Sequence, residues 1–337
     1  MSHEWKSDRY PHGNFALARN VALSNTTSDY VMWLDCDDIP PTPAEMFEIR
    51  HVLVDKKRDF YLMPYYINRD ENGIYTMVFK RERIFKNDKT IRWEYACHEQ
   101  IDVSRYSTFG DIVNCGIRHG SDKSPIIGIE RNLAIQEHEL KYTDSVHVRF
   151  NYAKDLIFKN NFDYSIDREK NALSILENIV SKHELGDDNL SMICSLIAQT
   201  YAYKPNDNGA NKSLQEKNRK QAEHFSHLCI SFGDYMAEPY VILGDFLFSS
   251  GELKKCIPLY KNAISKKPSG ISVSNLSFYD DIPSYRLSKV YHELKDIELA
   301  LHYNRRALRY SPKSKDLIDD RACMIRKLVE EICPTHS

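Results

Sequence analysis

The sequence Tyr30-Val-Met-Trp-Leu34, followed at once by Asp35-Cys-Asp-Asp38, decides the fold of the first part of this 337-residue chain. Five apolar residues in a row are too few to span a membrane and are typical of a buried strand in a parallel sheet. Three carboxylates then follow at the predicted end of that strand, where open α/β sheets bind their ligands. Ile39-Pro-Pro41 comes next, and two prolines cannot continue a strand ladder. We therefore expect the acids on a turn at the edge of a sheet.

These neighbouring carboxylates repel one another unless a positive charge lies between them. A divalent cation together with a diphosphate is the simplest such partner, because hard cations prefer oxygen ligands. A solvated acidic turn explains the same residues without any ligand. The turn alone leaves both interpretations open.

Further motifs on either side of the acidic turn resemble the core of family 2 glycosyltransferases of the GT-A fold. In that family a helix with Arg-Asn leads to a strand ending in Asp-x-Asp, a Trp-x-x-x-x-His-Glu segment follows, and a late strand carries a histidine. The resemblance covers about residues 4–140 and keeps the family's order. Its parts are Phe15-Ala-Leu-Ala-Arg-Asn20, the strand and acids from Ser28 to Asp38, Trp93-Glu-Tyr-Ala-Cys-His-Glu99, Gly116-Ile-Arg-His-Gly120, and Lys123 with Arg131-Asn-Leu133 of a closing helix.

This resemblance implies a metal-dependent, inverting transfer of a sugar from a nucleotide-sugar donor to a protein, glycan or other acceptor. A carboxylate would take the acceptor proton. Manganese accepts an imidazole ligand, whereas magnesium prefers oxygen alone, and either is expected as the metal. The implied roles are Glu99 as general base, Asp35, Arg19 and Lys123 at the donor, Asp37 and His119 on the metal, and Trp93, His98 and Asp38 as a possible wall of the sugar site.

Each of these residues also has a structural interpretation. Arg19 is expected to form an ion pair that holds the acidic turn, rather than to contact donor phosphates. His98 and Glu99 could be a structural pair, and a lone His119 is usually a satisfied polar group. The basic run Lys80-Arg-Glu-Arg83 is predicted to be a solvated strand end, with a clamp on a donor phosphate or an anionic acceptor as the alternative.

Local signals predict the elements around the motifs. Asn14 can cap the first helix, and Thr42-Pro-Ala-Glu45 is a capping box with proline at the first helical position. Asn-Gly supplies the positive φ of a hairpin turn. The expected elements are a helix to about Lys57, strands at Asp59–Ile67 and Ile74–Phe79 joined by the turn Asp70–Gly73, a strand at Asp111–Ile117, and a mobile loop at Gly120–Gly128.

From about Val146 the pattern changes to long amphipathic helices. Residues 237–268 match tetratricopeptide-repeat positions, with Cys256 where alanine is usual, and a second unit ends at Pro312 after an insert at Ser269–Asp281. A weaker unit begins near Cys194 and is interrupted by the loop Pro205–Asn211, and residues 152–179 suggest a degenerate pair. We therefore predict a partial GT-A, Rossmann-like mixed α/β domain at 1–143 and an all-α tetratricopeptide-like solenoid at 144–337.

Composition limits the function classes. The formal net charge of −2 gives no overall field for nucleic acid, which is not an expected partner. No run approaches the length of a membrane helix, and Met-Ser-His-Glu-Trp5 lacks the apolar core of a signal peptide. Eight cysteines without a Cys-x-x-Cys pair indicate thiols of a reducing cytoplasm.

The family's opening strand–helix–strand unit, which holds the nucleotide base, has no counterpart before Tyr30. The chain could be a natural short form or a fragment, or a partner chain or second copy could complete the sheet. Two other functions stay open: an inactive remnant whose repeats form a protein-binding scaffold, and sugar transfer to modified phage-type DNA.

Overall fold

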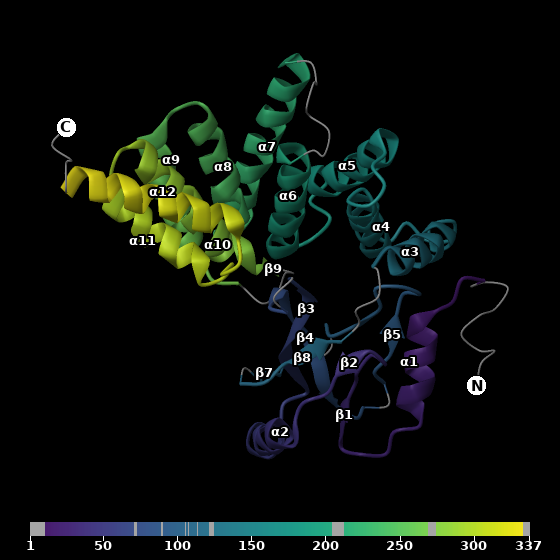
Figure 1. Ribbon diagram of the computed structural model, residues 1–337. Helices are drawn as coiled ribbons and strands as arrows, with labels where there is room; N and C mark the ends of the chain where they lie inside the picture. The colour runs from purple at the N-terminus through teal and green to yellow at the C-terminus, as the bar shows by residue number, and fades with distance from the viewer. Residues whose placement is uncertain are drawn as a thin grey trace. The chain divides into compact units, whose positions relative to one another are not determined.

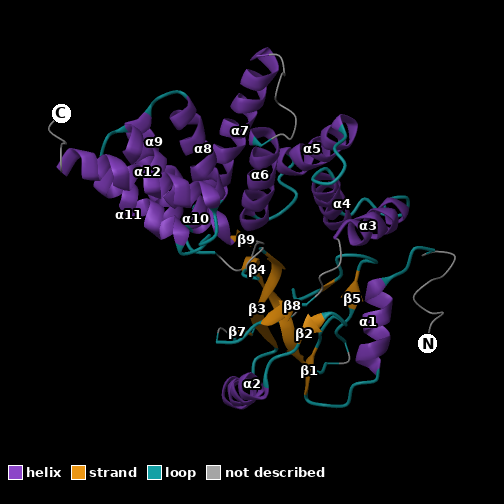
Figure 2. Ribbon diagram, viewed as in Figure 1, coloured by secondary structure: helices purple, strands orange, loops and turns teal. Residues whose placement is uncertain are grey.

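The computed structural model describes residues 11–70, 73–88, 90–104, 106, 108–112, 114–120, 125–203, 212–268 and 274–332. The chain divides into two compact units, of which unit 1 comprises residues 1–68 and 79–186 and unit 2 residues 69–78 and 187–337. Figure 1 labels the helices and strands, and Figure 2 separates them by type. The fold is a mixed sheet followed by a helical solenoid.

The main sheet has the strand order β1-β4-β3-β8-β2, with β7 also on β3 and β9 on β4. β1 is antiparallel to β4, β8 is parallel to β3, and β2 is antiparallel to β8. A separate antiparallel pair joins β5 and β6. The bounds are β1 Tyr30–Met32, β2 Asp38–Ile39, β3 Phe60–Arg69, β4 Tyr75–Lys86, β5 Trp93–Glu94, β6 Gln100–Ile101, β7 Phe109–Asp111, β8 Ile117–His119 and β9 Ser274–Asn275.

Two helices cover opposite faces of this sheet. α1 (Phe15–Ser24) packs with Phe60 and Phe85, whereas α2 (Pro43–Lys56) packs with Tyr61 and Ile84. Neighbouring strand residues point to opposite faces, so these contacts place the two helices on opposite sides. Figure 2 shows the strands lying between them.

Both helices begin where the sequence predicts. The Asn14 side chain accepts the Leu17 N–H at 2.9 Å, and Thr42 and Glu45 form the reciprocal capping box of α2. These caps satisfy backbone donors that the first helical turn leaves without partners.

The expectation that Tyr30–Leu34 is a buried strand in a parallel sheet is wrong. β1 is only three residues long, pairs antiparallel with β4, and stands at the end of the strand order. Val31 packs on the α1 side, Tyr30 and Met32 lie on the α2 side, and Leu34 is exposed. The apolar run therefore reflects helices on both faces of the strand, which the sequence pattern cannot distinguish from parallel neighbours.

Two further expectations need correction. The strand expected at Asp111–Ile117 is divided into β7 and β8, which both pair in parallel with β3. The loop expected at Gly120–Gly128 ends earlier, because α3 (Pro125–Glu139) already includes Gly128. The hairpin between β3 and β4 agrees with the prediction, and Gly73 has a φ of +78° in its turn.

α3, α4 (Val146–Lys159) and α5 (Ile166–Ser181) follow the sheet within unit 1 and pack in sequence. The predicted boundary at 143/144 lies in the connection between α3 and α4. Whether it separates domains stays a prediction.

Unit 2 consists mainly of helix pairs in tetratricopeptide-like order, α6 with α7, α8 with α9 and α10 with α11. Cys256 and Tyr260 are fully buried in their core. A Cβ atom on Gly244 would lie 2.6 Å from the Tyr260 ring, so glycine is required for this close helix approach. The bounds are α6 Asp187–Ala202, α7 Lys212–Phe232, α8 Glu238–Ser249, α9 Leu253–Ser265, η1 Leu276–Tyr279, α10 Asp281–Glu293, α11 Ile297–Leu308 and α12 Lys315–Ile332.

The insert expected between the last two repeats contains β9 and η1 in its described part. Residues 269–273 of this insert lie outside the described residues, as does the predicted loop 205–211. β9 pairs with residues 77–78 of β4, which also belong to unit 2. Across the described part of the chain, no helix is both long and apolar enough to cross a bilayer. The seven described cysteines are free thiols.

Candidate functional site

The acidic turn and the late histidine meet through strand pairing. Cys36 and Asp37 form a turn between β1 and β2, and Asp38 lies directly opposite His119 in the β2–β8 register. The Gly120 N–H donates to the Asp37 carbonyl at 2.7 Å. A Cβ atom on Gly120 would lie only 2.9 Å from that oxygen, so a larger residue would push the histidine strand away from the turn.

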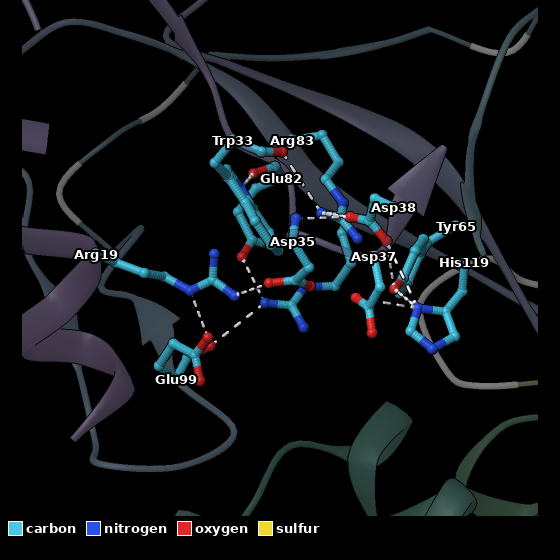
Figure 3. Close-up of polar contacts among 11 residues, drawn as sticks. Arg19, Trp33, Asp35, Asp37, Asp38, Tyr65, Glu82, Arg83, Glu99 and His119 are labelled. Atoms are coloured by element: carbon cyan, nitrogen blue, oxygen red, sulfur yellow. Dashed lines mark hydrogen bonds and ion pairs between the residues drawn. The ribbon is translucent and has the colours of Figure 1, made fainter. Parts of the chain in front are cut away.

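Asp37, Asp38 and His119 each place one possible ligand atom within 4.8 Å of the others. His119 Nδ1 lies 3.7 Å from Asp37 Oδ1 and 3.7 Å from Asp38 Oδ1. Figure 3 marks these contacts with dashed lines. Two carboxylates and an imidazole are a donor set that suits manganese better than magnesium. The Asp37 side chain is 52% exposed and accessible to an ion, so the residues present fit a divalent metal.

Asp38 is less available, because its carboxylate is already engaged inside the protein. Its side chain is 0% exposed, and Oδ2 accepts from Arg83 Nη1 at 3.0 Å and from the Asp35 backbone N–H at 2.9 Å. Tyr65 donates its hydroxyl to Oδ1 at 2.8 Å. Burial, followed by this contact with Asp38, raises the pKa of Tyr65, so its hydroxyl keeps its proton. Asp38 therefore holds the turn in shape. Asp37 and His119 are the more exposed members of the cluster, and the Tyr65 hydroxyl also lies 3.2 Å from His119 Nδ1.

Arg83 supplies the buried positive charge of the turn. Its guanidinium lies between the rings of Trp33 and Tyr65, 3.8 and 4.1 Å from their centroids. Burial lowers the pKa of Arg83, and the charge of Asp38 offsets this only in part. The sequence predicts a solvated strand end here, but the Arg83 side chain is 0% exposed, so for this residue that prediction is wrong.

Arg19 joins the acidic turn to the predicted base. Its Nη2 lies 2.5 Å from Asp35 Oδ1, and its Nε donates to Glu99 Oε1. The guanidinium also stacks 4.4 Å from the Trp33 ring and 5.0 Å from the Trp93 ring. Burial disfavours its charge, but Glu99 and Asp35 outweigh this and raise the pKa of Arg19. The contact with Asp35 agrees with the ion pair expected from the sequence.

Glu99 ends the loop between β5 and β6, and its side chain is 12% exposed. Arg81 Nη2 donates to the Glu99 carbonyl at 3.3 Å and also contacts Glu82. The neighbouring His98 points elsewhere, with Nε2 2.7 Å from Asp155 Oδ2. His98 and Glu99 are therefore not a hydrogen-bonded pair, since each carries its own partner.

Of the two remaining predicted site residues, the structure describes Trp93 but not Lys123. Trp93 is 4% exposed and packs edge-on against Trp33 at 5.0 Å, beneath Arg19, and its role as a wall of a sugar site stays a prediction. Lys123 lies outside the described residues. The structure thus brings Arg19, Asp35, Asp37, Asp38, Glu99 and His119 into one connected region (Figure 3).

Sequence reasoning missed the residues that support this region from other elements. It places Tyr65 only within a strand, and it describes α4 only as an amphipathic helix. Yet His147, Asn151 and Asp155 recur every four residues beside buried Val148 and Leu156. Polar side chains repeated on the core face of a helix indicate a buried polar contact, and that signal is present in the sequence.

Comparisons with known proteins give little further information. No protein-family model matches the chain, and no curated protein is significantly similar to it. Among solved structures, one similar chain is a thermophilic TPR protein from Thermus thermophilus, at 16% identity and a TM-score of 0.36 over 59% of this chain and 92% of that one. Since a TM-score this low supports no argument, the tetratricopeptide-like assignment rests on the helix pairing described above.

Proposed function

We propose that the chain is a metal-dependent glycosyltransferase of the GT-A type that transfers a sugar from a nucleotide-sugar to an acceptor with inversion. The observation that carries this proposal is the Arg19 bridge, which joins Asp35 of the acidic turn to Glu99. The base candidate Glu99 and the donor-binding candidate Asp35 thus lie on either side of one guanidinium. An inverting transfer needs a base close to the bound donor, because the acceptor is deprotonated as it attacks.

Asp37 and His119 would hold the metal, with Asp38 fixing the turn beneath them. Bound there, the metal would neutralise negative charge that develops on the departing diphosphate. Arg19 binds the carboxylates of both Asp35 and Glu99 and balances their negative charges. The protein's own contribution is thus a preorganised set of charges.

In the transfer step, the acceptor hydroxyl oxygen forms a bond to the anomeric carbon and loses its proton to Glu99. The bond between that carbon and the diphosphate oxygen breaks, and the nucleoside diphosphate leaves with the electron pair. Arg19 donates to Oε1 of Glu99, so Oε2 is the oxygen that takes the proton. Glu99 acts as a general base throughout, and no covalent enzyme intermediate forms.

The test is a panel of nucleotide-sugars with manganese or magnesium, assayed with peptide and glycan acceptors. Mass spectrometry of the products should show a sugar added to one acceptor class, and release of the nucleoside diphosphate should match it. Donor binding by calorimetry provides a second measurement. A chain that binds no donor with either metal would overturn the proposal.

A second function, that of a protein-binding repeat scaffold, is favoured by the three successive helix pairs α6–α11 of unit 2. Stacked helix pairs present extended surfaces that many proteins use for binding. The ligand of this scaffold would be a protein or glycan held by the repeats. Failure of donor binding in the panel would leave the scaffold as the better account.

A further inference from the structure

The loop that carries Glu99 is held by two helices that sequence reasoning did not connect with the site. It comprises residues 95–99 between β5 and β6. From α3, Glu139 accepts the Ala96 N–H at 3.3 Å. From α4, the His147 ring stacks on the Tyr95 ring with centroids 4.2 Å apart. All of these residues belong to unit 1.

The backbone of this loop is strained. Tyr95 and His98 have φ values of +68° and +51°, a left-handed conformation that non-glycine residues adopt rarely. Such conformations cost free energy and persist only when the surroundings hold them. Since His98 directly precedes Glu99, the contacts that hold His98 also set where the Glu99 backbone lies, whereas Arg19 and Arg81 contact the Glu99 side chain and carbonyl.

Two contacts from α4 fix His98. Its imidazole Nε2 lies 2.7 Å from Asp155 Oδ2, and its carbonyl accepts from His147 Nε2 at 2.8 Å. A carboxylate only accepts hydrogen bonds, so Asp155 requires a proton on His98 Nε2. Burial lowers the pKa of His98, which favours the neutral ring and makes the Nε2–H form the expected tautomer.

Burying the Asp155 carboxylate costs free energy, because the charge loses its contact with water. Its side chain is 4% exposed, and Gln136 donates to the same Oδ2 at 3.2 Å. Burial favours the neutral acid, but contacts with His98, Lys154 and Gln136 outweigh it and lower the pKa of Asp155. An apolar side chain would fill the same space without the cost of burying a charge. The hydrogen bond from His98 Nε2 therefore explains why this position carries a carboxylate.

We propose that Asp155 is a positioning residue for the Glu99 base, acting through the His98 ring and backbone. This inference rests on the proposed transferase function. It adds a role for α4, the helix where the composition of the chain changes. Asp155 touches neither donor nor acceptor; it sets the orientation of the residue that precedes the base.

The experiment compares the full chain with Asp155→Asn, which keeps the size of the side chain and removes its charge, and with Asp155→Ala. Glu184→Gln is the matched control. Glu184 accepts a hydrogen bond at 2.7 Å from Arg149, which lies on α4 as Asp155 does. Within the described part of the chain, Glu184 makes no hydrogen bond to the loop 95–99. Circular dichroism and thermal unfolding establish that each variant is folded. If Asp155→Ala does not fold, the isosteric Asp155→Asn still gives the result.

The first readout is nitrogen NMR of histidine-labelled protein, with the His98 signals identified by their loss in His98→Gln. The parent should show the Nε2–H tautomer. In Asp155→Asn the amide can donate to Nε2, so the Nδ1–H tautomer should gain population, and Asp155→Ala should show a mixture. A structural role elsewhere in α4 would leave these signals unchanged.

The second readout is the transfer rate with the donor found in the panel. Because a misplacement of the base by about 1 Å can cost up to roughly a hundredfold, kcat should fall about ten- to hundredfold with the donor KM unchanged. Unchanged His98 signals, or a kcat equal to that of Glu184→Gln, would overturn this inference alone. Absence of transfer by the parent chain would instead overturn the proposed function, and this inference with it.

Discussion

Two arginines supply the positive charge that the acidic turn requires. Arg83 is buried against Asp38, and Arg19 bridges Asp35 and Glu99. The sequence indicated that neighbouring carboxylates need a cation and predicted Arg19 as one partner, but it did not identify Arg83 as the other. With both present, the exposed Asp37 is the acid whose charge is left for a ligand.

Replacing Glu99 by glutamine should separate catalysis from donor binding. Glutamine cannot take a proton, so kcat should fall about a hundred- to ten-thousand-fold. Donor affinity should persist, because Arg19 keeps its contact with Asp35. Transfer kinetics and donor calorimetry measure the two effects, with the exposed Glu94→Gln on β5 as the control. Equal losses in both variants would remove Glu99 from the mechanism.

Asp37→Ala should abolish the stabilisation that manganese gives in the presence of a nucleoside diphosphate. Binding to the folded state alone raises the unfolding temperature, and Asp37 is the most accessible carboxylate of the cluster. Thermal unfolding with and without manganese measures the shift. The exposed Asp55→Ala on α2 should behave as the parent does; a metal-dependent shift retained in Asp37→Ala would place the metal elsewhere.

Arg83→Met should destabilise the folded chain by about 3–5 kcal/mol, because it leaves the Asp38 carboxylate buried without its charged partner. Among the described residues, Nε and Nη2 of Arg83 have no hydrogen-bond partner. Its contacts are the two rings, Asp38 and a long hydrogen bond of 3.5 Å from Nη1 to the Trp33 carbonyl. Urea unfolding measures the change. The double variant Arg83→Met with Asp38→Asn should recover part of the loss, and a double variant no more stable than Arg83→Met would argue against the pair.

At the scale of elements, the sequence predicted what depends on neighbours along the chain. The Asn14 cap, the Thr42–Glu45 capping box and the extent of α2 all agree with local signals. What it could not predict depends on distant partners. The antiparallel pairing of β1 and the polar contacts of α4 with the loop 95–99 both arise from tertiary packing.

The same distinction between local signals and distant partners applies to the candidate site. Asp35, Asp37, Glu99 and His119 could be named from ordered motifs, whereas their connections could not. Arg83 looks like any strand-end arginine in the sequence, because burial depends on the β1–β4 register. Asp155 lies far along the chain in a helix whose average pattern is amphipathic, which conceals a single buried carboxylate.

The contact between α4 and the loop 95–99 should make stability depend on pH. Burial lowers the pKa of His147 from its ordinary 6.5 to about 4, so the unfolded chain takes up a proton at a higher pH than the folded chain. Stability from this residue is therefore fully present above pH 6.5 and is lost as the pH falls toward 4.

His147→Gln should reduce the slope of stability against pH between these values, because glutamine does not titrate. Urea unfolding at several pH values between the two pKa values measures the slope. His51→Gln, a change at an exposed histidine of α2, serves as the control. A slope for His147→Gln equal to that of the parent would show that other groups dominate this acid sensitivity.

At the scale of the whole molecule, composition and contacts suggest different divisions. The helical pattern begins near residue 144, whereas the compact units divide between residues 186 and 187. α4 has helical composition, yet its buried polar stripe contacts the loop that carries Glu99. The first helices after the sheet therefore belong to the same compact unit as the candidate site, and the second unit resumes at α6.

Two fragments distinguish these divisions. A fragment of residues 187–337 should keep its helical circular dichroism and unfold in one transition, because each helix pair contacts mainly its neighbours. It lacks only residues 69–78 of its unit, which include the strand partner of β9. A fragment of residues 144–337 should show a second transition at lower temperature, since α4 would lose the loop 95–99 and α3, which cover its buried face. A single shared transition in the longer fragment would instead favour the boundary at 143/144, with α4 and α5 as part of the solenoid.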